Sequence, residues 1–114
     1  MKLNEIVELL NLEVKTCQSG LDGEVKGGYA SDLLSDVIAN AKEGDIWITL
    51  QIHQNIVAVA FLNNLAGIII VGGRNPDAET LSKAEEQGVV VLASEMSTYD
   101  LVGQLYSMGV KRSE

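Results

Sequence analysis

The sequence has little of several residue types that would indicate particular chemistries. Its 114 residues include one cysteine, Cys17, so neither an intrachain disulfide nor a cysteine cage for zinc can form. Cys17 falls on a predicted strand, where a buried structural thiol is expected. Aromatic residues make up only 4% of the chain, so its core must be built mainly from Ile, Val, Leu and Ala.

Long apolar runs and clustered basic residues are also missing. No apolar stretch reaches the roughly 18 residues of a membrane-spanning helix, and the amino-terminal residues lack a signal-peptide pattern. Eight Lys and Arg residues against sixteen Asp and Glu residues give a net charge of -8, and only Lys111 and Arg112 are adjacent. We therefore expect a cytoplasmic protein with neither a membrane nor a nucleic-acid partner.

The length fits one domain spanning residues 1–114. Hydrophobic spacing predicts strands at 12–17, 45–50, 66–71 and 89–94, an extended segment near 24–29, and helices at 5–10, 31–44, 55–64, 76–87 and 97–109. The second helix is expected to have Ser31 as its N-cap, to close at Gly44, and to place on one face Leu33, Leu34, Val37, Ile38 and Ala41.

Alternation of short apolar strands with helices predicts the α/β class. We expect a three-layer α/β/α domain with a mostly parallel sheet of four to five strands. The pattern of segment 55–64 also suits a strand, because Ile56, Val57 and Val59 are β-branched. Its alanines and the need for a crossover connection favour the helix.

The stretch "VGGRNPDAETL" at 71–81 leaves a predicted strand through Gly72 and Gly73. It lacks the Lys and the Ser or Thr of a Walker-type phosphate loop. Asn75 is suited to be an N-cap, and Pro76, the only proline, suits a first helical position. The stretch is therefore either a plain strand-to-helix turn or, through Arg74, an anion-binding helix start.

The remaining polar candidates are isolated. His53 follows a strand at its carboxyl end, where open α/β sheets place ligands, and it could act as a base or lie on the surface. Asp32 and Asp36 sit four apart on a predicted helix, where a solvated face is favoured over a cation site. No nucleophile with a base can be assembled, so we expect no enzyme activity, no metal site and no cofactor.

The order of blocks over essentially the full chain resembles the DRTGG domain family. The blocks are "EIVELLNLEVKT", "VKGGYASDLLSDVIANAKEGDIWIT", "LAGIIIVGGRNPDAETLSKAEEQGVVVLAS" and "STYDLVGQL". The family's Gly-Gly falls on Gly72 and Gly73, with Val71 in place of its Thr, and its Asp-Arg pair, which would fall near Ile52 and His53, is not retained. The resemblance, which extends to the N-terminal domain of HPr kinase/phosphorylase, implies an α/β accessory module used in regulation and dimerisation.

Two functions remain open. The first is a non-catalytic regulatory module that forms a homodimer and senses a small anionic ligand such as an adenine nucleotide. The second is a structural protein-interaction subunit that supports a partner enzyme without a small ligand. A ligand is expected at the carboxyl ends of the strands, near Thr49, Gln51, His53, Asn55, Gly72, Gly73, Arg74 and Asn75.

Overall fold

Five strands form one sheet in the computed structural model of the protein, which describes residues 1–113. Strands β2 to β5 are parallel to one another, and β1 pairs antiparallel with β5. The spatial order is β1-β5-β4-β3-β2. The strands are β1 (Glu13–Val14), β2 (Gly27–Ala30), β3 (Asp45–Thr49), β4 (Gly67–Ile70) and β5 (Val91–Ala93). The predicted α/β class and mostly parallel sheet are confirmed.

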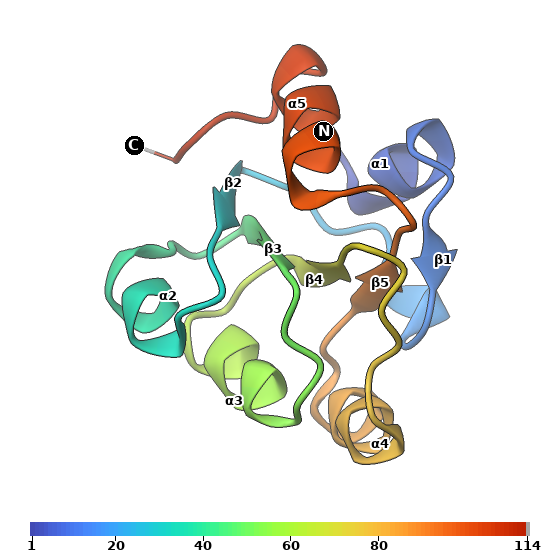
Figure 1. Ribbon diagram of the computed structural model, residues 1–114, viewed down its shortest axis with the longest axis vertical. Coiled ribbons are helices and arrows are strands. Elements are labelled where there is room, and N and C mark those ends of the chain that lie inside the picture. The colour runs from blue at the N-terminus through green and yellow to red at the C-terminus, as the bar shows by residue number, and fades with distance from the viewer. Residues whose placement is uncertain (114) are drawn as a thin grey trace.

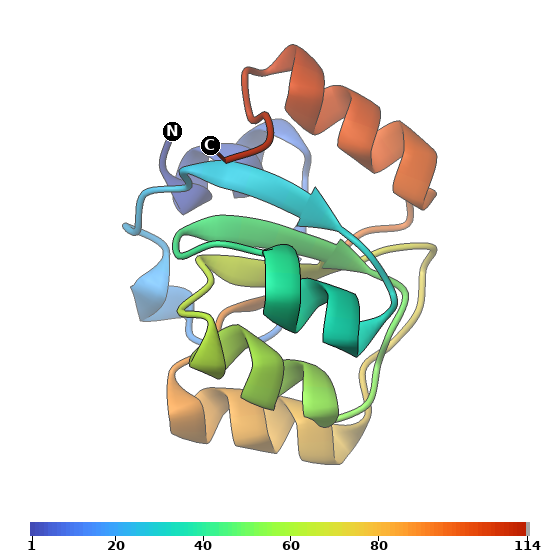
Figure 2. The same cartoon turned by 90° about the vertical axis from the view of Figure 1, so that its left-hand side faces the viewer.

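Helices cover both faces of this sheet, as Figures 1 and 2 show. One layer holds α2 (Leu34–Asn40), α3 (Asn55–Leu62) and α4 (Ala78–Gln87), and the other holds α1 (Leu3–Leu9) and α5 (Thr98–Ser107). A short 3₁₀ turn, η1 (Gln18–Gly20), lies between β1 and β2. None of the helices in residues 1–113 combines the length and apolar character needed to span a membrane.

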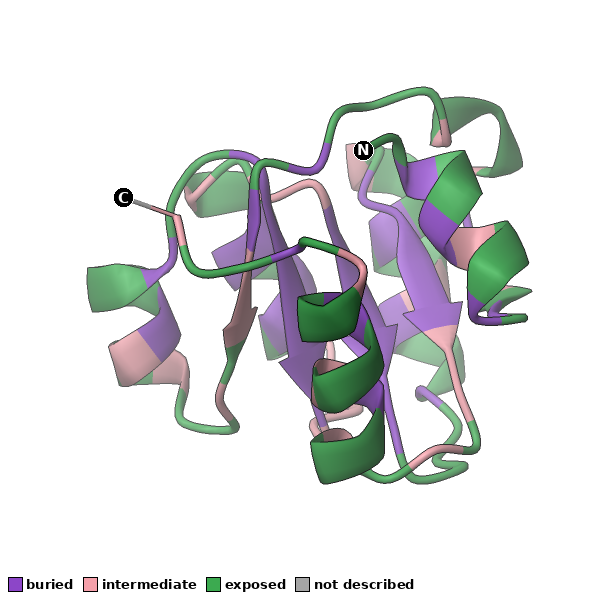
Figure 3. Ribbon diagram, turned by 90° about the horizontal axis from the view of Figure 1, so that it is seen from above, coloured by how far each residue is buried: buried purple, intermediate pink, exposed green. Residues whose placement is uncertain are grey.

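Two hydrophobic cores form because alternate residues of a strand point to opposite faces. On β3, Ile46 and Ile48 pack with α1 and α5, whereas Trp47 packs with α2 and α3. On β4, Ile69 joins the first core, and its neighbours on either side join the second. Figure 3 shows buried strands between helices whose outer faces are exposed. The central strand β4 therefore consists of continuous buried apolar residues, as a parallel sheet covered on both faces requires.

Of the segment 55–64, residues 55–62 form the helix α3, so the prediction of a helix rather than a strand is confirmed. Ile56, Val57 and Val59 are all buried against the sheet and its neighbouring helices. The crossover from β3 to the adjacent parallel strand β4 needs a connection that returns to the starting edge of the sheet, so tertiary context overrides the β-branched preference.

The predicted boundaries and packed face of α2 were wrong. The Ser31 hydroxyl accepts a hydrogen bond from the Leu33 N–H (3.2 Å) outside the helix, and Leu33, in an extended conformation, is the N-cap. The helix stops before Ala41, whose backbone is again extended, rather than at Gly44. Leu33 and Ile38 are 64% and 45% exposed, because this shorter helix turns only part of its predicted apolar face inward.

The predicted start of α4 at Asn75 and Pro76 was also wrong. Asp77 is the N-cap, and its N–H donates a hydrogen bond to the Ile52 carbonyl (3.2 Å). This contact and the burial of Pro76 keep Asp77 in an extended conformation, so the first helical residue is Ala78.

Cys17 lies beyond the strand on which it was predicted. Strand β1 ends at Val14, and Cys17 has a left-handed backbone (φ +56°) that begins η1. Its side chain is half-buried, with the sulfur 3.5 Å from the Val89 carbonyl oxygen. The turn departs from the alternating pattern because the chain must here leave the edge of the sheet.

Candidate ligand site at the carboxyl ends of the strands

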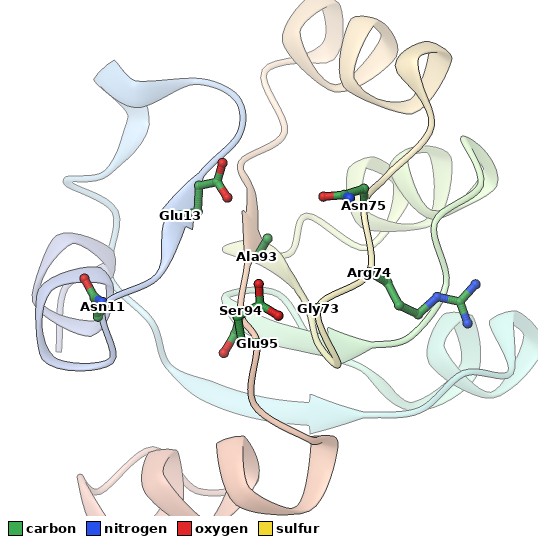
Figure 4. A pocket seen from close by; sticks show the side chains of 8 residues that line it. All are labelled: Asn11, Glu13, Gly73, Arg74, Asn75, Ala93, Ser94 and Glu95. Carbon is green, nitrogen blue, oxygen red and sulfur yellow. The ribbon is translucent and has the colours of Figure 1, made fainter.

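The parallel strands β3, β4 and β5 end at the same edge of the sheet, and the loops that follow them enclose two hollows. The first has a volume of about 190 Å³ and is shown in Figure 4; its lining residues are Asn11, Glu13, Gly73, Arg74, Asn75, Ala93, Ser94 and Glu95. The second has a volume of about 250 Å³, with a lining of Asp32, Leu50, Gln51 and Arg74. Arg74 is the residue that the two hollows share.

The two glycines after β4 shape the wall of the first hollow. Gly72 and Gly73 have positive φ angles of +74° and +69°, a region that favours glycine. Their N–H groups donate to the carbonyls of Met96 (2.7 Å) and Ser94 (3.0 Å). Both glycine N–H groups are therefore occupied, whereas those of Arg74 and Asn75 make no hydrogen bond within residues 1–113.

The first hollow has an acidic lining. The Glu13 carboxylate, which pairs with Lys15 at 2.9 Å, and the Glu95 carboxylate both belong to it. The Glu95 carboxylate lies so close to Gly73 that a Cβ there would overlap it. In Figure 4 the Arg74 side chain extends away from Glu13 and Asn75. This hollow therefore suits a neutral polar group better than an anion.

The second hollow combines the cation of Arg74 with the carboxylate of Asp32, whose orientation is fixed by hydrogen bonds. The Asp32 Oδ1 atom accepts hydrogen bonds from the Thr49 hydroxyl (2.8 Å) and the Leu50 N–H (2.7 Å), and the Gln51 amide donates to the Asp32 carbonyl (2.9 Å). Arg74 forms no salt bridge within the part of the chain described. Its guanidinium is therefore available to a ligand, while the orientation of Asp32 is fixed.

The structure brings together only part of the predicted site. Gln51 and Arg74 line the second hollow, and Gly73, Arg74 and Asn75 line the first. Thr49 is buried, with its hydroxyl bonded to Asp32. The remaining predicted residues line neither hollow: His53, Asn55 and Gly72.

His53 lies on the loop before α3. Its Nδ1 atom accepts a hydrogen bond from the Asn55 N–H at 3.3 Å, and both side chains are exposed. The geometry therefore gives His53 a local role at the start of α3, away from the two hollows.

Asp32 is the site residue that the sequence analysis did not find. It was assigned to a solvated helix face, but it precedes α2 and sits directly after β2. Its position after a strand, at the edge where Thr49 ends β3 and Gly72 follows β4, was the signal that could have identified it. No group of three His, Cys, Asp or Glu side chains that could hold a metal ion occurs within residues 1–113.

The fold defines the class of this domain. It is an α/β domain with an open, largely parallel sheet and polar hollows where the strands end. Within that class, the chain belongs to the DRTGG domain family, whose model matches residues 5–108. The family resemblance drawn from the sequence is thus confirmed. A comparison with curated proteins gave no significant match.

A solved structure shares the fold. It contains the CBS and DRTGG domains of the regulatory region of Clostridium perfringens pyrophosphatase, complexed with the activator diadenosine tetraphosphate. The TM-score is 0.69 at 18% sequence identity, and the match covers 89% of this chain. The chain spans 44% of that solved chain, so the likeness concerns one domain of a larger protein.

Proposed function

We propose that this chain is a non-catalytic regulatory module that self-associates and senses a small anionic ligand of the nucleotide type. The observation that carries the proposal is the position of Arg74, an exposed cation without a carboxylate partner in residues 1–113, in the wall of the second hollow. A guanidinium presents a planar fork of donors that matches a phosphate oxygen pair.

The second hollow favours a ligand with two kinds of polar group. Arg74 supplies donors for an anion, whereas Asp32 retains Oδ2 as an acceptor, since both of its hydrogen bonds use Oδ1. A ribonucleotide has a phosphate for the first and hydroxyl groups for the second.

The solved neighbour supports a regulatory role. Its DRTGG domain belongs to the regulatory region of an enzyme, and that region is complexed with a nucleotide activator. By analogy we propose that this chain acts on a partner enzyme rather than catalysing a reaction itself.

Calorimetric titration with AMP, ADP, ATP and diadenosine tetraphosphate tests ligand binding. We expect one of the four to bind and Arg74→Ala to weaken it by at least about tenfold, the loss expected for a charge-assisted Arg–phosphate contact. Arg112→Ala, which removes an arginine outside both hollows, is the matched control and should bind normally. The absence of heat from every nucleotide with the wild-type chain would reject the ligand.

A second function is favoured by the outer face of α3, where Phe61 and Leu62 are 60% and 70% exposed. This face fits a protein-interaction subunit that binds no small molecule. Such a subunit would give no heat with nucleotides but would still associate with protein, so the same titration separates the two functions.

A further inference from the structure

Helix α3 has no charged residue in its sequence, NIVAVAFL. An amphipathic surface helix normally places charged side chains on its outer face, and a helix that is apolar all round is normally buried. The inner face of α3 is buried against β3 and β4, but Ala58, Phe61 and Leu62 remain exposed. In a chain of net charge -8, this charge-free outer face is unusual.

The outer face borders a groove between α3 and α4, which pack side by side (Figure 2). The groove has a volume of about 590 Å³, larger than either hollow at the carboxyl ends of the strands, and its lining residues are Val57, Ala58, Phe61, Leu62, Lys83 and Gln87. One patch therefore offers both large protruding side chains and a recess beside them.

We infer that this patch, termed the α3–α4 face, is the surface through which two copies of the chain associate about a two-fold axis. The inference rests on the self-association in the proposed function and locates it. A two-fold interface uses the same patch on both copies, so it needs knobs and holes on one surface. Phe61 and Leu62 are the knobs, and the groove is the hole.

The charges of α4 favour a second copy over a different partner. Lys83 lies between Glu79 and Glu86, at spacings of four and three residues that share one side of the helix. Two such helices related by a two-fold axis can set the lysine of each beside a carboxylate of the other. Elsewhere the net charge of -8 makes two copies repel, so the uncharged α3 is where they can approach.

The surface area of one face of the chain is sufficient for a dimer interface of standard size. A standard interface buries about 800 Å² on each partner. The chain has a surface of 6042 Å² and extends over 33 × 28 × 25 Å, so one broad face can supply such an area. We expect a dimer held mainly by a small apolar centre, with Phe61 as the aromatic anchor.

Sedimentation velocity tests the interface with the variant Phe61→Gln/Leu62→Gln, which removes apolar surface without changing charge. At about 100 µM, a concentration suited to the weak affinity of a small interface, the wild type should sediment as a dimer of the 12.2 kDa chain and the variant as a monomer. The dimer dissociation constant should rise at least about tenfold. The control Leu9→Gln/Tyr99→Gln, at residues 62% and 88% exposed on α1 and α5, should remain dimeric.

The outcomes separate this inference from the proposed function. A wild-type monomer would overturn self-association as well as the interface, whereas a variant that stays dimeric with an unchanged thermal midpoint would overturn only the interface. Nucleotide binding, measured by calorimetry, tests the ligand independently of either result. Circular dichroism confirms that each variant is folded, as its exposed positions predict.

Discussion

The Thr49 hydroxyl donates a hydrogen bond of 2.8 Å to the carboxylate of Asp32, joining the end of β3 to the loop before α2. Thr49 is buried, and its hydroxyl also accepts a hydrogen bond from the Gln51 N–H at 3.1 Å. Two residues 17 apart in sequence thus fix the wall of the second hollow. The buried Thr49 therefore orients the carboxylate that we assign to ligand binding.

Thr49→Val should lower the free energy of unfolding by about 1–2 kcal/mol, because it leaves the Gln51 N–H and one Asp32 interaction unpaired. The variant has nearly the same shape, so no large cavity contributes. Urea unfolding followed by circular dichroism measures the difference. Thr49→Ser, which keeps the hydroxyl, is the control; if Val and Ser cost the same, lost packing rather than hydrogen bonding is responsible.

A second buried hydroxyl ties the segment after β1 to β5. Thr16 Oγ1 donates to the Val89 carbonyl (2.7 Å) and accepts from the Val91 N–H (2.9 Å). Thr16→Val should destabilise the protein by about 1–3 kcal/mol, since two buried backbone groups lose their partner. Chemical unfolding of this variant beside Thr16→Ser measures it. A Val variant as stable as the wild type would show that these groups find other partners.

Two glycines with open space around them should respond in opposite directions. Gly103 lies within α5, so Gly103→Ala should stabilise the protein by about 0.5–1 kcal/mol through helix propensity. Gly88 closes α4 with φ +74°, so Gly88→Ala should destabilise it by roughly 1–2 kcal/mol. Thermal unfolding of both variants checks this prediction. Changes of the same sign would contradict the assigned backbone conformations.

The pH dependence of stability should respond to Tyr29. Hydrogen bonds to Asp36 from Ser31, Tyr29 and Asn40 lower the pKa of its carboxyl below the ordinary 3.8. Such a group stabilises the fold above its unfolded pKa, and this contribution disappears as the pH falls through the folded pKa. The Tyr29 hydroxyl lies 2.9 Å from both carboxylate oxygens.

Tyr29→Phe removes one of these donors, so the variant should lose less stability than the wild type between pH 7 and about pH 3, a range in which an aspartate of the unfolded chain takes up its proton. Urea titrations at both pH values provide the comparison. Tyr106→Phe, at an exposed tyrosine on α5, serves as the control. Equal acid losses in the wild type and Tyr29→Phe would argue against this contribution.

Cys17 should react slowly with alkylating reagents. Burial, and then the nearby Glu85 carboxylate, raise the pKa of its thiol above the ordinary 9.0, and these effects exceed the opposing hydrogen bond of Thr16. Because the thiolate is the nucleophile, iodoacetamide at about pH 8 should modify the folded protein more slowly than the urea-unfolded protein. Mass spectrometry over time measures both rates, and a faster reaction in the folded state would contradict the raised pKa.

The sequence predicted elements better than it predicted their ends. Continuous apolar strands such as residues 67–70 indicated the parallel sheet, and the order of the sequence blocks indicated the family. The starts of α2 and α4 were missed because Ser31 bonds within a turn and Asp77 is held by the distant Ile52 carbonyl. Capping rules use neighbouring residues and do not include such tertiary contacts.

The candidate site was likewise predicted only in part from the sequence. That Arg74 and Gln51 follow strands was visible in the sequence, and the rule that ligands bind at carboxyl strand ends placed them together. Loop conformations decide the rest of the site. They set the direction of the Arg74 side chain, bring Asp32 into the wall of the second hollow and keep His53 out of both hollows. These loops follow from contacts across the sheet edge rather than from local pattern.

The sequence by itself determined the α/β class, the succession of strands and helices and the scarcity of charge on α3, because hydrophobic periodicity records which faces are buried. Only the tertiary structure decided which polar groups share a hollow and which apolar side chains stay exposed. The reason is physical: Asp32 meets Thr49, and Phe61 stays uncovered beside the groove, only after parallel strands bring distant segments to one edge or face.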